Sequence, residues 1–260
     1  MNIIVCIKQV IDTAAKISVS GGKVDSAGSP RVMNPYDEFA VEEALQIKQR
    51  KPDTEITLIS LGPESFKEVL KKGLAMGADH AVHLSDPQFE TLDNLGVARA
   101  LATAIQKRPH DLILSGRQAV DDDMAQVGPA LAVLLQIPFV TVVTDLQFSG
   151  DYKQAKITRQ IEGGSETLDV SVPFLVTCQK GLNTPRLPSL KGIIAAKKKP
   201  VTTLSANDIG FDVASLGNPR VRQAELALPP TRKKGAVLDG PLETSLPELV
   251  RLLREEEKVV

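Results

Sequence analysis

The sequence predicts an α/β fold, with a mostly parallel, Rossmann-like sheet that carries helices on both faces. Apolar runs of strand length alternate with segments of helical period from the first residues onward, which is typical of such sheets. These runs are continuous rather than alternating, as expected of strands buried on both faces. The chain has 260 residues, of which 42% are hydrophobic and 24% charged, so it can bury a full core. An antiparallel hairpin region and an extended C-terminal arm complete the expected fold.

The first part of the chain alternates strands and helices. Residues 2–7 form an apolar strand, and alternating residues around Gly21-Gly22 predict a hairpin. A helix begins at Asn34-Pro35, because Asn caps helices and Pro is tolerated at the first helical position. Further strands are expected at 55–61, 81–84, 111–115 and 139–143, and helices after Gly62-Pro63, at 93–107 and at roughly 124–135.

The pattern changes near residue 144. Hairpin strands are expected at 146–148, 154–160 and 166–172, and a buried strand at 173–178. Six prolines then punctuate a segment with little helical or strand period, which we expect to lack a core of its own. A last helix is expected over Ser245–Glu256, with Ser245 as its cap. We therefore expect one α/β domain over residues 1–180 and an extended arm over 181–260.

Composition excludes several classes of protein. The formal net charge is −1, whereas nucleic-acid binders usually carry a basic excess, and aromatic residues are only 3% of the chain. Cys6 and Cys178 lie in apolar runs and offer neither a metal knuckle nor a disulfide framework, which fits a reducing compartment. The apolar N-terminus is too short for a signal peptide, and no run of ~18 apolar residues predicts a membrane span. We expect a cytoplasmic protein with no direct membrane insertion.

The motifs of common enzymes are missing. The sequence has no Walker-type loop, no Gly-x-Gly-x-x-Gly, no Gly-x-Ser-x-Gly and no His-Glu-x-x-His. His80, His83 and His110 are interpreted as surface residues, since no carboxylate or thiol is spaced to form a triad or ligand set with them. We therefore expect no catalytic residue and no metal site.

A loop that follows a predicted buried strand is the candidate binding segment. It runs from Gly116 to Pro129 and opens a helix, so it lies at the carboxyl edge of the sheet, where nucleotides bind in open α/β folds. Gly116 would let a ligand approach closely, and a helix start after Asp123 would offer free amides to a phosphate. The alternative is an ordinary acidic helix cap, because Asp at a helix start interacts favourably with the helix dipole. Three aspartates would also repel a phosphate. Other strand-end segments converge there, namely Cys6 to Lys8, Asn34 to Asp37 and Leu61 to Pro63.

A basic run near residue 198 is the strongest local charge feature. Lys197, Lys198 and Lys199 follow Arg186 and Lys191 with no acidic residue between them. Such a run is either a solvated face or a docking site for an acidic partner. Apolar residues just ahead of it could anchor a transient contact, namely Leu187, Leu190, Ile193 and Ile194.

Several of these stretches together resemble the beta subunit of electron transfer flavoprotein. They are residues 5–12, 33–44, 74–79 and 116–123, followed by 157–168 and 173–177, which look like that family's signature. Residues 185–199 look like its recognition loop, within an expected loop over 183–199. The likeness is collinear from residue 2 to about residue 210 and is weaker in the tail.

The resemblance implies a heterodimer with an FAD-bearing alpha subunit, which the C-terminal arm of the beta chain wraps. It also implies AMP as a structural nucleotide in the crevice of an α/β nucleotide-binding domain. The matching positions are Cys6, Asn34, Pro35, Tyr36, Asp37, Leu61, Gly116, Arg117, Gln118, Ala119, Val120, Asp121, Asp122, Asp123, Met124, Ala125, Gln126 and Val127.

The resemblance further implies a soluble electron carrier. Electrons would pass from an acyl-CoA dehydrogenase or a related enzyme to the shared FAD, and then to a membrane quinone oxidoreductase. The family's docking leucine falls on Leu190, with the basic residues Arg186, Lys197, Lys198 and Lys199 around it.

Three alternatives remain at this point. Some family members perform electron bifurcation with a second FAD in place of AMP and oxidise NADH. Asp122 and Met124 resemble the AMP type, whereas Ala125 to Pro129 resemble the bifurcating type. Gln160 stands where some relatives carry a glutamate that pairs with an alpha-subunit arginine. From other classes, a stand-alone ATP-using α/β enzyme would need a phosphate-gripping loop that is missing here, and a structural adaptor would bind no nucleotide.

Overall fold

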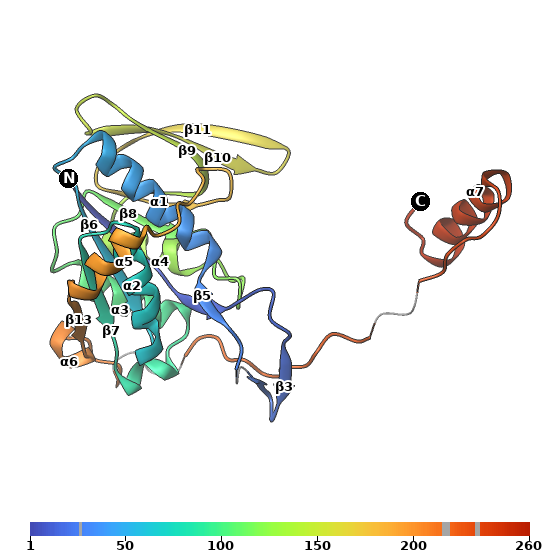
Figure 1. Cartoon of the computed structure of the whole chain (residues 1–260), viewed down its shortest axis with the longest axis horizontal. Helices are drawn as coiled ribbons and strands as arrows, with labels where there is room; N and C mark the ends of the chain where they lie inside the picture. The colour runs from blue at the N-terminus through green and yellow to red at the C-terminus, as the bar shows by residue number, and fades with distance from the viewer. Residues whose placement is uncertain (26–27, 215–218, 232–234) are drawn as a thin grey trace.

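The computed structural model describes residues 1–25, 28–214, 219–231 and 235–260 and confirms the α/β fold. The described residues form a nine-stranded sheet in the order β11-β10-β9-β12-β8-β1-β6-β7-β13 (Figure 1). β1 (Asn2–Cys6) pairs in parallel with β6 (Glu55–Leu61) on one side and with β8 (Leu112–Gly116) on the other. Because the chain order reverses beside β1, a crevice is expected at the carboxyl ends of these strands.

The remaining strands extend the sheet in both directions. On the β6 side lie β7 (His80–Leu84) and β13 (Val201–Leu204), both parallel. On the β8 side lie β12 (Phe174–Cys178) and β9 (Phe139–Phe148), also parallel. The hairpin of β10 (Gln154–Ile161) and β11 (Gly164–Ser171) continues antiparallel from β9. The two strands expected at 139–143 and 146–148 are a single strand, β9. Its first part pairs in parallel with β12 and its last part pairs antiparallel with β10.

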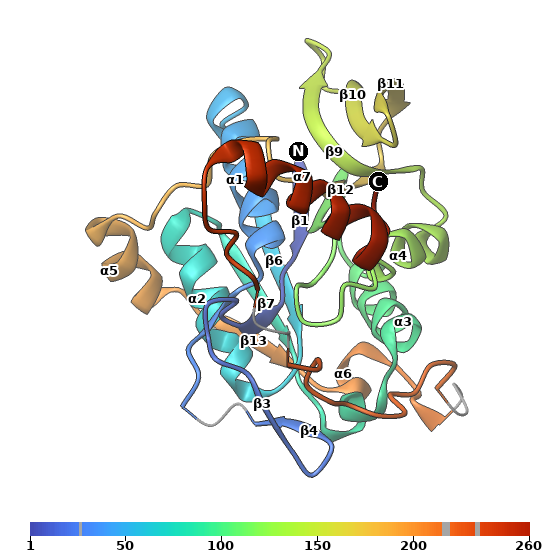
Figure 2. The ribbon, with the colours of Figure 1, turned by 90° about the vertical axis from the view of Figure 1, so that its right-hand side faces the viewer.

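Helices cover both faces and bury a separate apolar cluster on each. On one side α1 (Pro35–Arg50) and α2 (Lys67–Met76) pack on the sheet, and α5 (Leu190–Lys198) packs outside α2 (Figure 2). The other side carries α3 (Asn94–Ile105), α4 (Val127–Leu135) and the short α6 (Ala206–Ile209). His83 lies within the sheet and is fully buried, with Nε2 2.9 Å from the carbonyl of Gly62, so the expectation that it lies on the surface was wrong.

Short elements decorate this framework. β2 (Gln9–Ile11) pairs with β5 (Arg31–Met33), and two 3₁₀ turns occupy Glu64–Phe66 (η1) and Pro87–Thr91 (η2). β3 (Ser18–Ser20) and β4 (Lys23–Asp25) form the expected hairpin. Its turn places Gly21 and Gly22 at φ of 56° and 72°, a backbone conformation that favours glycine.

The C-terminal segment differs from expectation over residues 190–209. We expected no core contacts there, but α5 packs on α2, β13 pairs with β7, and α6 buries Ala206 and Ile209. A side chain at Gly192 would collide with the carbonyl oxygen of Ala75, which shows how closely the two helices approach. The elements are too short, and too closely bounded by Pro188 and Pro200, for their periodicity to be visible in the sequence.

The end of the chain lies away from the body (Figure 1). α7 (Leu242–Arg251) continues into a π-helical turn (Leu252–Glu256). It begins three residues before the expected Ser245, because the carbonyl of Pro241 accepts hydrogen bonds from the amides of Thr244 and Ser245. Its apolar side chains are largely exposed, namely Leu242, Leu246, Leu249 and Val250. In the part of the chain that the structure describes, no helix is long and apolar enough to cross a lipid bilayer.

Candidate functional site

A cavity opens at the carboxyl edge of the sheet, where the chain order reverses. Its volume is about 170 Å³, and it is open to solvent at its mouth. Its walls are the ends of β1, β6 and β8, the first turn of α1, helix α3, and the loop that leads into α4. The predicted residues that line it are Cys6, Asn34, Asp37, Leu61, Gly116, Arg117, Gln118, Ala119, Asp122, Ala125, Gln126 and Val127.

The other predicted residues do not line the cavity but belong to, or are hydrogen-bonded to, the elements that do. Pro35 and Tyr36 belong to the first turn of α1. The amide of Val120 donates to Asn34 Oδ1 at 3.2 Å, and the amide of Met124 donates to Asp122 Oδ1 at 3.0 Å. Asp121 and Asp123 engage Lys8 and Gln118. The structure thus brings all the predicted crevice segments together, with these residues as support for the loop.

The sequence did not identify one whole wall of the cavity. Helix α3 contributes Asn94, Val97 and Leu101, and further unpredicted lining residues are Ile59, Phe66 and Ser115. The spacing of the α3 residues is the same as that of ordinary core packing, so no pattern distinguished them. Ser115 did carry a signal, because it is a polar residue at the end of an otherwise apolar strand.

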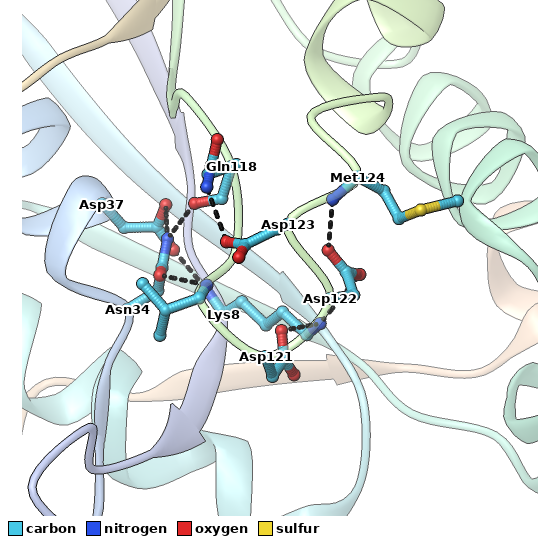
Figure 3. Close-up of polar contacts among 9 residues, drawn as sticks. Lys8, Asn34, Asp37, Gln118, Asp121, Asp122, Asp123 and Met124 are labelled. Carbon is cyan, nitrogen blue, oxygen red and sulfur yellow. Dashed lines mark hydrogen bonds and ion pairs between the residues drawn. The ribbon is translucent and has the colours of Figure 1, made fainter. Parts of the chain in front are cut away.

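Asn34 and Asp37 form a hydrogen-bonded centre beneath the loop (Figure 3). Asp37 Oδ2 accepts a hydrogen bond from the amide of Lys8 at 2.7 Å, and Oδ1 accepts from the amide of Gly116 at 3.0 Å. Asn34 Nδ2 donates to Asp37 Oδ1 and to the carbonyl of Gln118, both at 2.9 Å. The first turn of α1 therefore ties together the ends of β1 and β8 and the candidate loop.

Burial shapes the chemistry of this centre. Asp37 is only 5% exposed, and burial raises the pKa of its carboxyl from 3.8 to about 7, although its hydrogen bonds and Lys8 act in the opposite direction. Gly116 serves the same centre. A side chain at position 116 would collide with Asp37 Oδ1 and would lie 2.7 Å from Tyr36 Cβ. Gly116 lines the cavity as expected, and its lack of a side chain also makes room for the first turn of α1.

Intrachain partners balance the aspartates of the loop (Figure 3). Lys8 Nζ lies 2.8 Å from Asp121 and 3.5 Å from Asp122, and Gln118 Nε2 donates to Asp123. Asp123 has a positive φ of 51°, so the chain turns sharply there. The expected helix start after Asp123 was wrong, because α4 begins at Val127. The loop therefore spans residues 117–126, and Lys8 reduces the repulsion that its carboxylates would exert on a phosphate.

Three side chains of the cavity are suited to a ligand. Ser115 Oγ is buried and has no hydrogen-bond partner among the described residues. Cys6 is the register neighbour of Ser115, and burial raises the pKa of its thiol to about 12, so it remains neutral. Arg117 lines the cavity, and no ion pair involves it among the residues that the structure describes. Within those residues there is also no cluster of His, Cys, Asp and Glu side chains that could hold a metal ion.

A second candidate region lies on the outer face of α5. Leu187 and Leu190 are 87% and 75% exposed, and Ile193 and Ile194 are also exposed. Of the predicted basic residues, Lys197 and Lys198 are exposed, whereas Lys199 Nζ donates to the carbonyl of Ala78. Arg186 is bound to Glu42 within the chain. We call residues 183–199 the docking segment below.

Gln160 lies near the end of β10, beside Gln179, which directly follows β12. Its Oε1 accepts a hydrogen bond from Gln179 Nε2 at 3.4 Å. The amide can accept or donate hydrogen bonds, but it carries no charge with which to attract an arginine.

Comparison with known proteins identifies relatives over the whole chain. Residues 21–209 match the family model described as "Electron transfer flavoprotein domain". Electron transfer flavoprotein subunit beta of Bacillus subtilis is 39% identical over 261 residues, covering 100% of both chains. The mouse protein of that name is 38% identical over 263 residues, covering 100% of this chain and 99% of its own. Caffeyl-CoA reductase-Etf complex subunit CarD of Acetobacterium woodii is 41% identical over 244 residues, covering 92% of both chains.

Proposed function

The chain belongs to the electron transfer flavoprotein family as a beta subunit, and we propose that its crevice binds AMP as a structural nucleotide. Beta subunits of this family are electron carriers rather than enzymes, and they work with an alpha subunit. Because the chain belongs to this family, we no longer interpret it as a stand-alone ATP-using enzyme. The proposal specifies the dimer further, as a single-flavin carrier whose FAD is held mostly by the alpha subunit.

The cavity at the reversal of strand order is the observation that carries the nucleotide proposal. It combines apolar walls from β6 and α3 with a few converging polar groups, which is the usual composition of a nucleotide site. Ser115 Oγ is a buried group whose hydrogen bonding would be completed by a ligand. Arg117 would supply positive charge to a phosphate. The residues present therefore fit AMP, which would brace the ends of β1 and β8 and supply no redox chemistry.

FAD would supply the redox chemistry of the dimer, as the alpha subunit positions it. The beta chain would contribute the surface by which the dimer meets its electron donor. The exposed leucines of the docking segment, with Lys197 and Lys198 beside them, fit a small apolar anchor rimmed by positive charge. We infer that an acyl-CoA dehydrogenase or a related enzyme is the donor, and that a membrane quinone oxidoreductase is the acceptor.

Co-expression with the alpha subunit tests this proposal. The two chains should purify as a heterodimer whose flavin is reduced by a substrate-reduced acyl-CoA dehydrogenase and not by NADH. Reduction can be followed by the loss of flavin absorbance under anaerobic conditions. Reduction by NADH in the absence of a dehydrogenase would contradict the single-flavin proposal.

The bifurcating alternative has a specific observation in its favour. Ala125 to Pro129, which span the end of the loop and the start of α4, resemble the bifurcating type, and Ala125, Gln126 and Val127 line the cavity. A relative is named as a subunit of a caffeyl-CoA reductase-Etf complex. In that case a second FAD would occupy the crevice and NADH would be oxidised. Against it, Asp122 also lines the cavity and places a carboxylate where the bifurcating type has glycine.

A further inference from the structure

Arg186 was expected to contact a partner protein, but the structure directs its guanidinium inward. Its Nε donates to Glu42 Oε2 at 2.7 Å and its second terminal nitrogen donates to Oε1 at 2.8 Å. The backbone amide of Arg186 also donates to Glu42 Oε2, at 3.1 Å. One carboxylate of α1 thus receives three hydrogen bonds from a single residue of the docking segment.

Glu42 is a buried acid whose charge depends on this contact. Its side chain is 4% exposed, against 33% for Arg186. Burial alone would raise the pKa of Glu42, but the hydrogen bonds from Arg186 and Gln46 outweigh it, so the pKa is lowered. Removal of either partner would leave the other without compensation, which is strongly unfavourable for a buried group.

The rest of the docking segment is anchored on both sides of its exposed leucines. Ahead of Arg186, Asn183 Nδ2 donates to the carbonyl of Phe39 and to Glu43 Oε2, both at 3.0 Å. Beyond the leucines, Gly192 lies directly against the carbonyl of Ala75 at the end of α2. The segment therefore leaves α1 at residue 186 and reaches α2 at residue 192, and Leu187 and Leu190 project from the stretch between.

We propose that the Glu42–Arg186 ion pair is a clamp that positions the docking segment, so that Arg186 acts inside this chain and not on the electron donor. A segment that is already ordered loses less conformational entropy when a partner binds. This saving is a large share of the binding free energy when the contact is small and transient. The inference rests on the proposed function, because it assumes that Leu190 meets the donor. It makes Glu42 and Arg186 positioning residues for that contact.

Glu42→Gln distinguishes the clamp from a direct contact by Arg186. If Arg186 contacted the donor, neutralising Glu42 would leave the guanidinium of Arg186 free to bind the donor. The KM of the dimer for the reduced dehydrogenase would then stay the same or fall. The clamp predicts the opposite, with a KM that rises about three- to tenfold at unchanged kcat. It also predicts faster hydrogen exchange at the amides of residues 189–194 in the heterodimer.

Two further variants complete the test. Arg186→Lys keeps the positive charge but loses the planar fork that grips both carboxylate oxygens, so the clamp predicts a raised KM and faster exchange for it too. Lys197→Gln is the matched control, because it removes one charge from the same segment without touching the clamp. It should leave the exchange rates of residues 189–194 at their wild-type values.

The outcomes separate this inference from the docking assignment. If Leu190→Ala raises KM but Glu42→Gln changes neither KM nor exchange, the clamp is overturned and the docking surface stands. Faster exchange at an unchanged KM overturns the clamp as well, since the ordering would then have no consequence for docking. If Leu190→Ala itself has no effect on KM, the proposed docking function fails, and the clamp as a device for docking fails with it.

Discussion

The carboxylate of Asp37 lies directly against the backbone of Gly116, in a contact that joins the first turn of α1 to the end of β8. Asp37 Oδ1 accepts a hydrogen bond from the amide of Gly116 at 3.0 Å, and the space that a side chain would need at position 116 is filled by Asp37 and Tyr36. The same carboxylate accepts from the amide of Lys8 at the end of β1. A single buried acid therefore links the carboxyl ends of two neighbouring strands, at the edge of the sheet where the cavity opens.

Gly116→Ala should destabilise the protein and weaken AMP binding. The added methyl group must displace Asp37 or the α1 backbone, and overpacking of this kind costs about 2 to 3 kcal/mol. Denaturation of the heterodimer and AMP titration measure the two effects. Gly150→Ala is the matched control, because a side chain there meets nothing within 4 Å among the described residues. If both variants behave alike, the proposed role of the Asp37–Gly116 contact is wrong.

Asp37→Asn should flatten part of the pH dependence of stability. Burial raises the pKa of Asp37 from 3.8 to about 7, so the folded protein holds this proton more tightly than the unfolded chain. The stabilisation from the proton is fully present below about pH 4 and is lost as the pH rises through about 7. The stability of the variant relative to wild type should therefore improve with rising pH in this window, by at most about 1.4 kcal/mol per pH unit.

Urea denaturation at several pH values between 4 and 8 checks this prediction. Asp169→Asn, at an exposed position of β11, changes the charge equally without touching the crevice. A difference between Asp37→Asn and wild type that stays constant across the window would show that Asp37 is already ionised there.

Ser115→Ala should separate binding from stability. Ser115 Oγ has no partner among the described residues, so its removal should leave the free energy of unfolding unchanged or slightly higher. If AMP completes the hydrogen bonding of this hydroxyl, its affinity should fall about five- to tenfold, or roughly 1 kcal/mol. Calorimetric titration of AMP into nucleotide-free heterodimer measures this. An unchanged affinity would remove Ser115 from the binding site.

Leu190→Ala should slow electron transfer from the dehydrogenase without changing the bound flavin. Leu190 is 75% exposed, so its truncation should cost little stability, whereas a central apolar anchor of an interface often contributes about 2 kcal/mol to binding. Stopped-flow reduction of the dimer by reduced dehydrogenase gives the rate. Ile17→Ala removes an exposed apolar side chain elsewhere and serves as the control. Wild-type kinetics for Leu190→Ala would show that the donor docks elsewhere.

The sequence predicted the sheet and its crevice because both depend on local pattern. Continuous apolar strands such as Leu112–Gly116 bury both faces, and the carboxyl ends of parallel strands must share one edge. That edge places Cys6, Asn34 and Gly116 at one cavity. The start of α4 at Val127 was not predicted. The chain turns before the helix at Asp123 and Ala125, which both have positive φ, and neither residue type indicates such a turn in the sequence.

Contacts between distant segments could not be predicted from local pattern. Arg186 has the appearance of a free surface cation, and only the fold shows that Glu42, 144 residues earlier, binds it. The α3 wall of the cavity was not predicted for a similar reason, since the spacing of Val97 and Leu101 is the same as that of helix residues that pack in a core. In both cases the side chain is typical of its position, and its role comes from the element that packs against it.

Counting the nucleotides of the co-purified heterodimer decides between AMP and a second FAD in the crevice. Denaturing extraction followed by chromatography gives the amounts of FAD and AMP released per dimer. We expect one FAD and one AMP, with the AMP lost or reduced in Ser115→Ala. Two FAD and no AMP would contradict it, and would assign the crevice to a second flavin and the protein to the bifurcating type.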